Sequence, residues 1–255
     1  MSAPAAHGTH VTSLVGGKNT SAAPEANLYF LLWRSGYDTT AAMSELLEWA
    51  STHPTEVGVV NLSLGDPASS VNAWCQTMKA LFRQGMVPVT GAGNFSGPAA
   101  DSHPGGCRYN INVGNTIPLI GTNSLDRQNS TSEWGLAIDV WSPGYALGAC
   151  SEPEPLSPPM PAEFTVDKPG LKGQYKSIAS TECNTRYHFM NGTSMASPVT
   201  AGVALSYQAH TPQVDPEALR HLVISVGATA NAVSTHASEG EGVYEHYLGV
   251  DDGPT

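Results

Sequence analysis

Short apolar runs alternate with helical patterns along the first half of this 255-residue chain, and the alternation restricts the fold more than any other feature. Residues 26–33, 57–63 and 86–90 are rich in apolar side chains, as strands buried on both faces are. Between them, residues 39–53 and 70–84 carry apolar side chains at helical spacing. Strands that alternate with helices form a mostly parallel sheet with helices on both faces. The sequence therefore predicts an α/β fold with three layers.

The rest of the chain continues this pattern with one interruption. A short helix is predicted from His7 to Val15, two further strands at residues 109–114 and 137–141, and two helices, one following Ser194 and one near residues 216–223. The interruption is a proline-rich stretch at residues 150–183, which we expect to be a surface excursion. No linker composition divides the chain, so residues 1–255 are expected to form one domain, with an irregular tail.

Charge and hydropathy exclude two classes of partner. The formal net charge is -11 with only 11 lysines and arginines, so the basic surface that nucleic-acid binding needs is missing. No run of 18 apolar residues is present, so no membrane span is expected. We predict neither a nucleic-acid nor a membrane partner.

Four cysteines lie far apart and form no CxxC pair, which argues against zinc or a dithiol redox site. We favour disulfides between Cys75 and Cys107 and between Cys150 and Cys183, on nearness in sequence alone. Four free buried thiols in a cytosolic protein are the alternative. Disulfides would favour an extracellular location.

Chemically useful side chains follow the predicted strands or open the predicted helices. His7 opens the first helix, Asn94 follows the strand at residues 86–90, and Ser194 opens a helix after a Gly-Thr turn. In open parallel sheets ligands bind beyond the carboxyl ends of the strands, so these groups are expected to converge. A serine at a helix N-terminus also faces the positive end of the helix dipole.

Four motifs in this order resemble the subtilisin-like serine proteases, and the resemblance covers nearly all of the chain. They are His7-Gly8-Thr9-His10-Val11, Asn61-Leu62-Ser63-Leu64-Gly65, Gly91-Ala92-Gly93-Asn94 and Gly192-Thr193-Ser194-Met195-Ala196-Ser197-Pro198. The resemblance implies a serine endopeptidase in which Ser194 is the nucleophile and His7 the general base. It implies that Asn94 and the backbone N–H of Ser194 form an oxyanion hole. Extended polypeptide would bind between two walls, formed by Ser63, Leu64 and Gly65 and by Gly91, Ala92 and Gly93.

The resemblance implies no required cofactor. His10 is expected to be a packed helix histidine, although His7 and His10 at this spacing could in principle hold a metal. Asp139 aligns with a calcium ligand of some family members, but a capping or salt-bridged carboxylate is the favoured interpretation.

One family feature is missing from the sequence. The orienting aspartate of the family precedes the catalytic histidine on a central strand, and here only six residues precede His7. We therefore expect the aspartate-bearing strand to be absent from this chain, leaving an apolar slot beside the strands at residues 26–33 and 57–63. A separate N-terminal piece or a propeptide is an expected partner. Without the acid, the alternatives are a peptide-binding pseudoprotease or a transpeptidase or ligase of the same family.

Overall fold

The computed structural model describes residues 4–17, 20–31, 39–53, 58–67, 71–117, 126–145, 147–150, 187–212, 214–227 and 232–233. The α-helices of this part of the chain are α1 (Pro4–Gly16), α2 (Thr39–Thr52), α3 (Val71–Arg83), α4 (Thr193–His210) and α5 (Pro216–Gly227). The strands of the main sheet are β1 (Val59–Leu62), β3 (Val87–Gly91), β5 (Ile111–Ile117), β6 (Asp126–Gln128), β7 (Val140–Pro143) and β10 (Ala232–Val233). Two small antiparallel pairs lie outside it: β2 (Asp66–Pro67) with β4 (Ser102–His103), and β8 (Leu147–Cys150) with β9 (Tyr187–Met190). A single 3-10 turn at Ala99–Asp101 precedes β4.

Four strands of the main sheet run parallel in the order β1, β3, β5, β7. The register places Val59 beside Val87, Val89 beside Ile111, and Val113 beside Val140. At the end of β5, β6 pairs antiparallel to it, and β10 pairs parallel to β6. The α/β prediction is confirmed, with a parallel portion of four strands.

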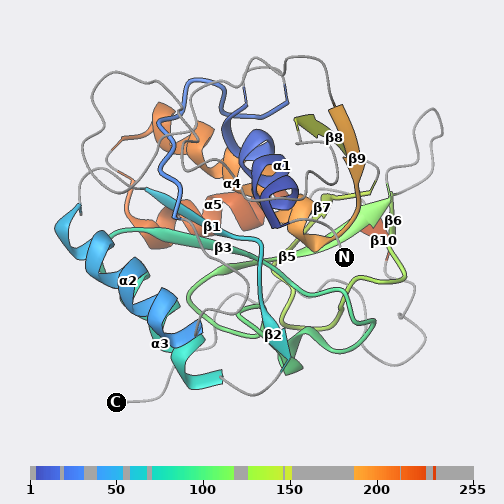
Figure 1. Ribbon diagram of the computed structural model, residues 1–255, viewed down its shortest axis with the longest axis horizontal. Helices are drawn as coiled ribbons and strands as arrows, with labels where there is room; N and C mark the ends of the chain where they lie inside the picture. Colours follow the sequence, from blue (N-terminus) through green and yellow to red (C-terminus); the bar gives the residue numbers. More distant parts are fainter. Residues whose placement is uncertain are drawn as a thin grey trace, which may run out of the picture.

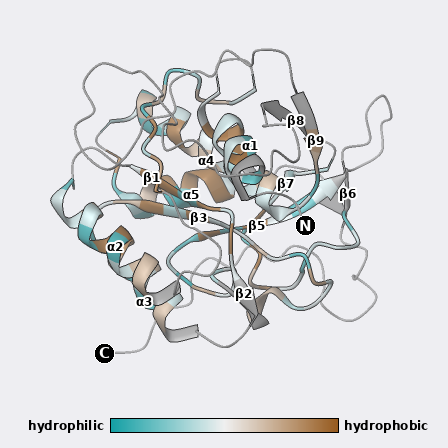
Figure 2. Ribbon diagram, in the orientation of Figure 1, coloured by the Kyte–Doolittle hydropathy of each residue, from teal (hydrophilic) through white to brown (hydrophobic). Residues whose placement is uncertain are grey.

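Two apolar clusters hold helices against this sheet. Val87 and Val89 of β3 pack with Ile111 and Val113 of β5 and with residues of α4 and α5, in one cluster. Leu62 and Met86 pack in a second cluster with α2 and α3. Alternate side chains of a strand point to opposite faces of the sheet, so the two clusters can lie on opposite faces of the same short strands. Figure 1 shows α4 and α5 close to the middle of the sheet and α2 and α3 together at its edge, and in Figure 2 brown, hydrophobic segments run through α4.

Two sequence predictions on strands need correction. The strand predicted at residues 26–33 is not formed over residues 26–31, where only Phe30 makes a single bridge, and residues 32–33 lie outside the described residues. A strand needs a ladder partner, and no strand of the described regions pairs with this segment. The strand expected at residues 137–141 begins only at Val140, because a turn closed by Ile138 N–H and the Gly135 carbonyl precedes it. Residues 151–186, which hold most of the proline-rich stretch, lie outside the described residues.

An ion pair that is largely shielded from solvent joins α5 to the sheet, with the Arg220 and Asp139 side chains 14% and 17% exposed. Arg220 Nη2 lies 2.8 Å from Asp139 Oδ1, and the other carboxylate oxygen accepts the backbone N–H of Asn112 at 2.8 Å. Arg220 Nε also donates to the Asn110 carbonyl. Burial raises the pKa of Asp139, while the Arg220 guanidinium and the Asn112 N–H oppose that rise. The salt-bridged interpretation of Asp139 is confirmed.

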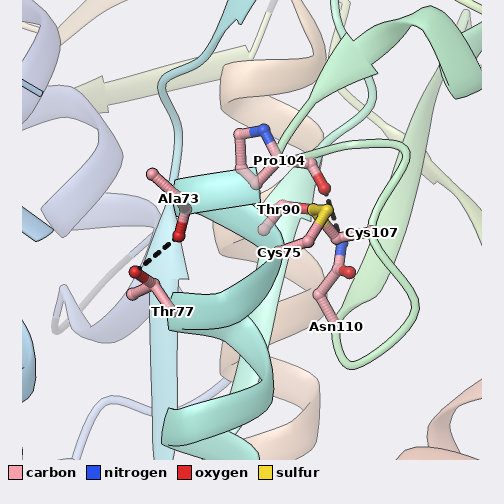
Figure 3. Close-up of a disulfide and its surroundings, with 7 residues drawn as sticks. All are labelled: Ala73, Cys75, Thr77, Thr90, Pro104, Cys107 and Asn110. Atoms are coloured by element: carbon pink, nitrogen blue, oxygen red, sulfur yellow. Dashed lines mark hydrogen bonds between the residues drawn. A yellow bond between two sulfur atoms is a disulfide. The ribbon is translucent and has the colours of Figure 1, made fainter. Parts of the chain in front are cut away.

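The disulfide between Cys75 and Cys107 is also confirmed. It joins α3 to the segment that carries Cys107, as Figure 3 shows. The Cys107 N–H donates to the Pro104 carbonyl and closes a turn there. Asn110, just beyond that turn, donates to Thr90 Oγ1 on β3 and to the Pro104 carbonyl. The expected partner of Cys150, Cys183, lies outside the described residues.

Within the described helices, none has the length and apolar character needed to cross a bilayer.

Removing the cation of the pair of Arg220 and Asp139 should destabilise the fold in a pH-dependent way. In Arg220→Met, Asp139 keeps its burial and loses its counter-charge, at a cost of about 3 kcal/mol near neutral pH. The folded-state pKa of Asp139 then lies further above its unfolded value near 4, so the unfolded state releases this proton first as the pH rises. We therefore expect the stability loss to be small near pH 4 and to grow with increasing pH, as measured by urea denaturation.

Glu217→Gln is the matched control for this prediction. Glu217 lies 3.0 Å from His221 and 3.9 Å from Arg220, but its side chain is 55% exposed. Pairs at such exposure contribute at most about 1 kcal/mol. If Arg220→Met and Glu217→Gln lowered the free energy of unfolding by the same amount at neutral pH, the role given to the pair of Arg220 and Asp139 would be contradicted.

Candidate active site

A glycine turn presents Ser194 at the start of α4. Gly192, the N-cap residue, has φ 141° and ψ 167°, a backbone conformation that side-chain-bearing residues rarely adopt. Its N–H donates to the Gly144 carbonyl after β7, which fixes the turn against the sheet. Ser194 follows in the first helical turn, where backbone N–H groups have no partner inside the helix. The backbone N–H of Ser194 is therefore available to an anion.

Asn94 is held so that its amide group is directed in one way. Its Oδ1 accepts the backbone N–H of Thr193 at 2.9 Å and lies 3.3 Å from Thr193 Oγ1. A backbone N–H can only donate, so the atom facing it must be the amide oxygen. This leaves the Asn94 NH₂ group as the part of the side chain free to bind a ligand oxygen, and Asn94 is exposed to solvent.

Glycines let the end of β3 come close to the start of α4. A Cβ atom on Gly91 would lie 3.0 Å from Thr193 Oγ1, and one on Gly192 would lie 3.3 Å from Asn94 Oδ1. Gly93 has φ +118° and donates its N–H to Thr193 Oγ1 at 3.2 Å. A side chain at Gly93 would also collide with the buried Glu133 carboxyl. The close contact between the Asn94 turn and the Ser194 turn thus depends on glycine at these positions.

A segment that the sequence analysis did not single out supports the Asn94 turn. Glu133 N–H donates to the Gly93 carbonyl at 3.0 Å, and Trp134 N–H donates to the Gly97 carbonyl at 3.0 Å. Ser96, with φ 57°, is held through its N–H by the Thr131 carbonyl and through its Oγ by the Ser130 carbonyl. These contacts are mostly made by the backbone, so no residue type in the segment 130–134 could have indicated them.

Ser63, at the carboxyl end of β1, lies directly against Ser194. Ser194 Oγ donates to the Ser63 carbonyl at 3.3 Å, and Ser63 Oγ donates to the Ser194 carbonyl at 2.8 Å. Beyond Ser63, Leu64 is half-buried and Gly65 is exposed. The segments that follow β1 and β3 therefore both contact the first turn of α4. That residues 63–65 and 91–93 form the walls of a peptide site stays a prediction.

His7 lies on α1, which packs against the start of α4. Leu14 of α1 and Met195 of α4 share a small buried cluster, to which Val11 and Val199 contribute. Residues seven apart lie on the same face of a helix, so His7 is on the face of α1 that carries Leu14. Figure 1 shows α1 lying across α4. His7 and Ser194 are half-buried, and no hydrogen bond between them is found.

Burial lowers the pKa of His7, and the nearby His10 lowers it further, because both disfavour imidazolium. His10 is fully buried on the same helix, as predicted for a packed histidine. In the described part of the chain no carboxylate pairs with His7. Nor does any group of three histidines, cysteines or carboxylates among those residues form a metal site.

The structure thus brings Ser194, Asn94, Ser63 and Gly93 into one hydrogen-bonded assembly, with Gly91 packed against it and His7 on the adjoining helix. Chemically, the assembly offers a hydroxyl, a side-chain NH₂ group and a backbone N–H at a helix N-terminus, which are groups that acyl transfer can use. Thr193, which orients Asn94, is the member whose role the sequence analysis did not recognise.

Comparisons with known proteins identify the family of the chain. A model of the subtilase family, peptidase S8, matches residues 2–243. The chain is 27% identical over 240 residues to alkaline serine exoprotease A of Vibrio alginolyticus, covering 93% of this chain and 38% of that protein. It is 29% identical over 213 residues to M-protease of Shouchella clausii, and the match covers 81% of this chain and 45% of that protein. It is 26% identical over 239 residues to subtilisin Savinase of Lederbergia lenta, and the match covers 91% of this chain and 74% of that protein. The chain therefore spans less than half the length of the first two relatives.

Solved structures show the same likeness. A cold-adapted subtilisin-like serine proteinase superposes with a TM-score of 0.62 at 26% identity, over 86% of this chain and 67% of that one. A psychrophilic protease named S41 has a TM-score of 0.68 at 20% identity, over 89% of this chain and 71% of that one, a likeness of fold. Because the family model spans nearly the whole sequence, the protein belongs to the subtilase family.

Proposed function

We propose that this protein is a serine endopeptidase in which Ser194 is the nucleophile. The observation that carries the proposal is the orientation of Asn94. Its oxygen is engaged by Thr193 N–H, so its NH₂ group is left to donate beside the unpartnered N–H of Ser194. Two N–H donors that converge next to a hydroxyl would stabilise the oxyanion of a tetrahedral intermediate.

In the proposed reaction His7 acts first as a base and then as an acid. It removes the proton of Ser194 Oγ as that oxygen attacks the scissile carbonyl, and then passes the proton to the leaving amine. A water molecule, activated by the same imidazole, releases the acyl group in the second half of the cycle. Imidazole titrates near neutral pH, so His7 can be neutral when it takes the proton and can carry it until the amine leaves.

The proposed substrate is extended polypeptide. Residues 63–65 and 91–93 follow two parallel strands and flank Ser194, and an extended chain could pair with their backbone groups as an added strand. The disulfide between Cys75 and Cys107 supports an extracellular location. No cofactor is proposed for the reaction itself. Structural calcium stays a prediction.

We further propose that a carboxylate from outside the described residues completes the site. His7 has no carboxylate partner among them, and β1 pairs with β3 as its only partner within the described sheet. A strand placed along the other side of β1 could supply an aspartate. A segment preceding residue 1, or a separate N-terminal piece, is the predicted source.

The proposal is tested with the protein that carries this segment, using a fluorophosphonate probe and an unfolded protein substrate. We expect the probe to label Ser194 and the substrate to be cleaved, with both lost in Ser194→Ala. Mass spectrometry of the products should show hydrolysed rather than joined peptides, which separates a protease from a ligase. Asn94→Ala should slow cleavage by about a hundredfold or more, a size taken from subtilisin, where such a donor has been removed.

Two outcomes would overturn the proposal. Peptide binding without labelling of Ser194 would mean a pseudoprotease. Joined peptides as the main product would mean a transpeptidase or ligase.

The pH dependence of cleavage reports whether a carboxylate reaches His7. The surroundings described here place the pKa of His7 below its ordinary value of 6.5. A nearby carboxylate would raise the pKa, because it favours imidazolium. Activity is lost as the pH falls through this pKa, so we expect the acid limb of kcat/KM in the intact protein to have its midpoint at or above about 6.5.

Neutralising the contributed carboxylate should move that midpoint below about 6.5. An acid limb already below this value in the unmodified protein would show that His7 works without a carboxylate partner.

A further inference from the structure

Pro198 removes a hydrogen bond from the peptide group that follows Ser194. In an α-helix the carbonyl of residue i accepts the N–H of residue i+4, so the donor for Ser194 would come from position 198. That position is Pro198, which lies inside α4 and has no N–H. The carbonyl of the proposed nucleophile therefore lacks its regular helical partner. A buried carbonyl left without a donor costs about 1–3 kcal/mol.

Ser63 supplies the missing donor from another element. Its hydroxyl donates to the Ser194 carbonyl at 2.8 Å, across 131 residues of sequence. Its main-chain carbonyl in turn accepts Ser194 Oγ at 3.3 Å. Each serine thus donates its hydroxyl proton to the main-chain carbonyl of the other.

The remaining contacts of Ser63 fix the direction of its proton. Ser63 Oγ lies 2.9 Å from Ser197 Oγ and accepts Asn61 Nδ2 at 3.0 Å. A hydroxyl has one proton and two acceptor positions. Since the proton points to the Ser194 carbonyl, Ser197 must donate to Ser63, and all three positions of the Ser63 hydroxyl are occupied. Ser63 is 9% exposed and Ser197 is fully buried, so the bond between the two hydroxyls is shielded from water.

We propose that the Ser63 hydroxyl is a positioning group for the nucleophile, replacing the helical hydrogen bond that Pro198 removes. This inference rests on the proposed function of Ser194. It assigns the Ser63 side chain a role separate from that of its main chain in binding peptide. The hydroxyl fixes the peptide group after Ser194, and through it the direction of Oγ and of the Ser194 N–H.

The test is a double-mutant cycle of Ser63→Ala and Pro198→Ala, in the protein that carries the acid-bearing segment. With Pro198 present, Ser63→Ala should lower kcat and the rate of fluorophosphonate labelling roughly tenfold, the loss of one hydrogen bond to a buried carbonyl. KM should change little, because the main chain of Ser63 is retained. In the Pro198→Ala background, position 198 has an N–H that can reach the Ser194 carbonyl, so the same replacement of Ser63 should cost less than about threefold.

Thr200→Ala is the matched control. Thr200 is a buried hydroxyl of the same helix whose Oγ1 donates to the Ala196 carbonyl, away from Ser194. Its loss should lower the melting temperature without slowing labelling. If Ser63→Ala does not fold, the comparison of Ser63→Ala/Pro198→Ala with Pro198→Ala alone still measures what the hydroxyl contributes once the helical N–H is restored. Ser63→Cys, a weaker donor, should then label at an intermediate rate.

The inference is overturned if Ser63→Ala labels as fast as the parent protein, or if it costs the same factor with Pro198 present and in the Pro198→Ala background. Failure of the parent protein to label at Ser194 is a different result, because it overturns the proposed function instead.

Discussion

The hydrogen bond from Thr193 N–H to Asn94 Oδ1 is the contact on which the arrangement of the site depends. It joins the loop after β3 to the first turn of α4, two segments that lie 99 residues apart in sequence. It also settles which way the Asn94 amide faces. Gly91 and Gly192 make the approach possible, since a side chain at Gly91 would press on Thr193 and one at Gly192 on Asn94. Geometry that is fixed before substrate arrives is what makes such donors effective.

The same junction is stabilised from three sides. The sheet holds the Gly192 turn through the Gly144 carbonyl, β1 holds the Ser194 peptide through Ser63, and residues 130–134 hold the Asn94 loop. Behind it, small residues of α4 such as Ala196 and Ala201 pack on β3 and β5. A hydroxyl held in this way would need little further ordering to act as the proposed nucleophile.

Much of this could be predicted from the sequence, and the failures have a physical pattern. The helices and the four parallel strands could be predicted from the apolar pattern. Asn94 and Ser194 could be predicted because they stand in motifs that resemble those of the subtilisin-like serine proteases. Residues 26–31 resemble a buried strand in composition, but strand formation depends on a partner that composition cannot reveal. The support from residues 130–134 is made mostly by backbone groups, which any sequence possesses. The sequence shows that Pro198 has no N–H for the Ser194 carbonyl, but it does not show that Ser63 lies close enough to donate instead. That contact depends on where the fold places the end of β1.

The central claim is that Asn94 and the backbone of Ser194 form a donor pair already aimed at an oxyanion. The most direct measurement is a high-resolution crystal structure of the protein with a phosphonyl group bound to Ser194 Oγ, whose oxygen imitates the oxyanion. The account predicts that this oxygen lies within hydrogen-bond distance of both Asn94 Nδ2 and Ser194 N, with Asn94 Oδ1 still bound to Thr193 N–H. A phosphonyl oxygen turned toward solvent, or an Asn94 side chain released from Thr193, would contradict it.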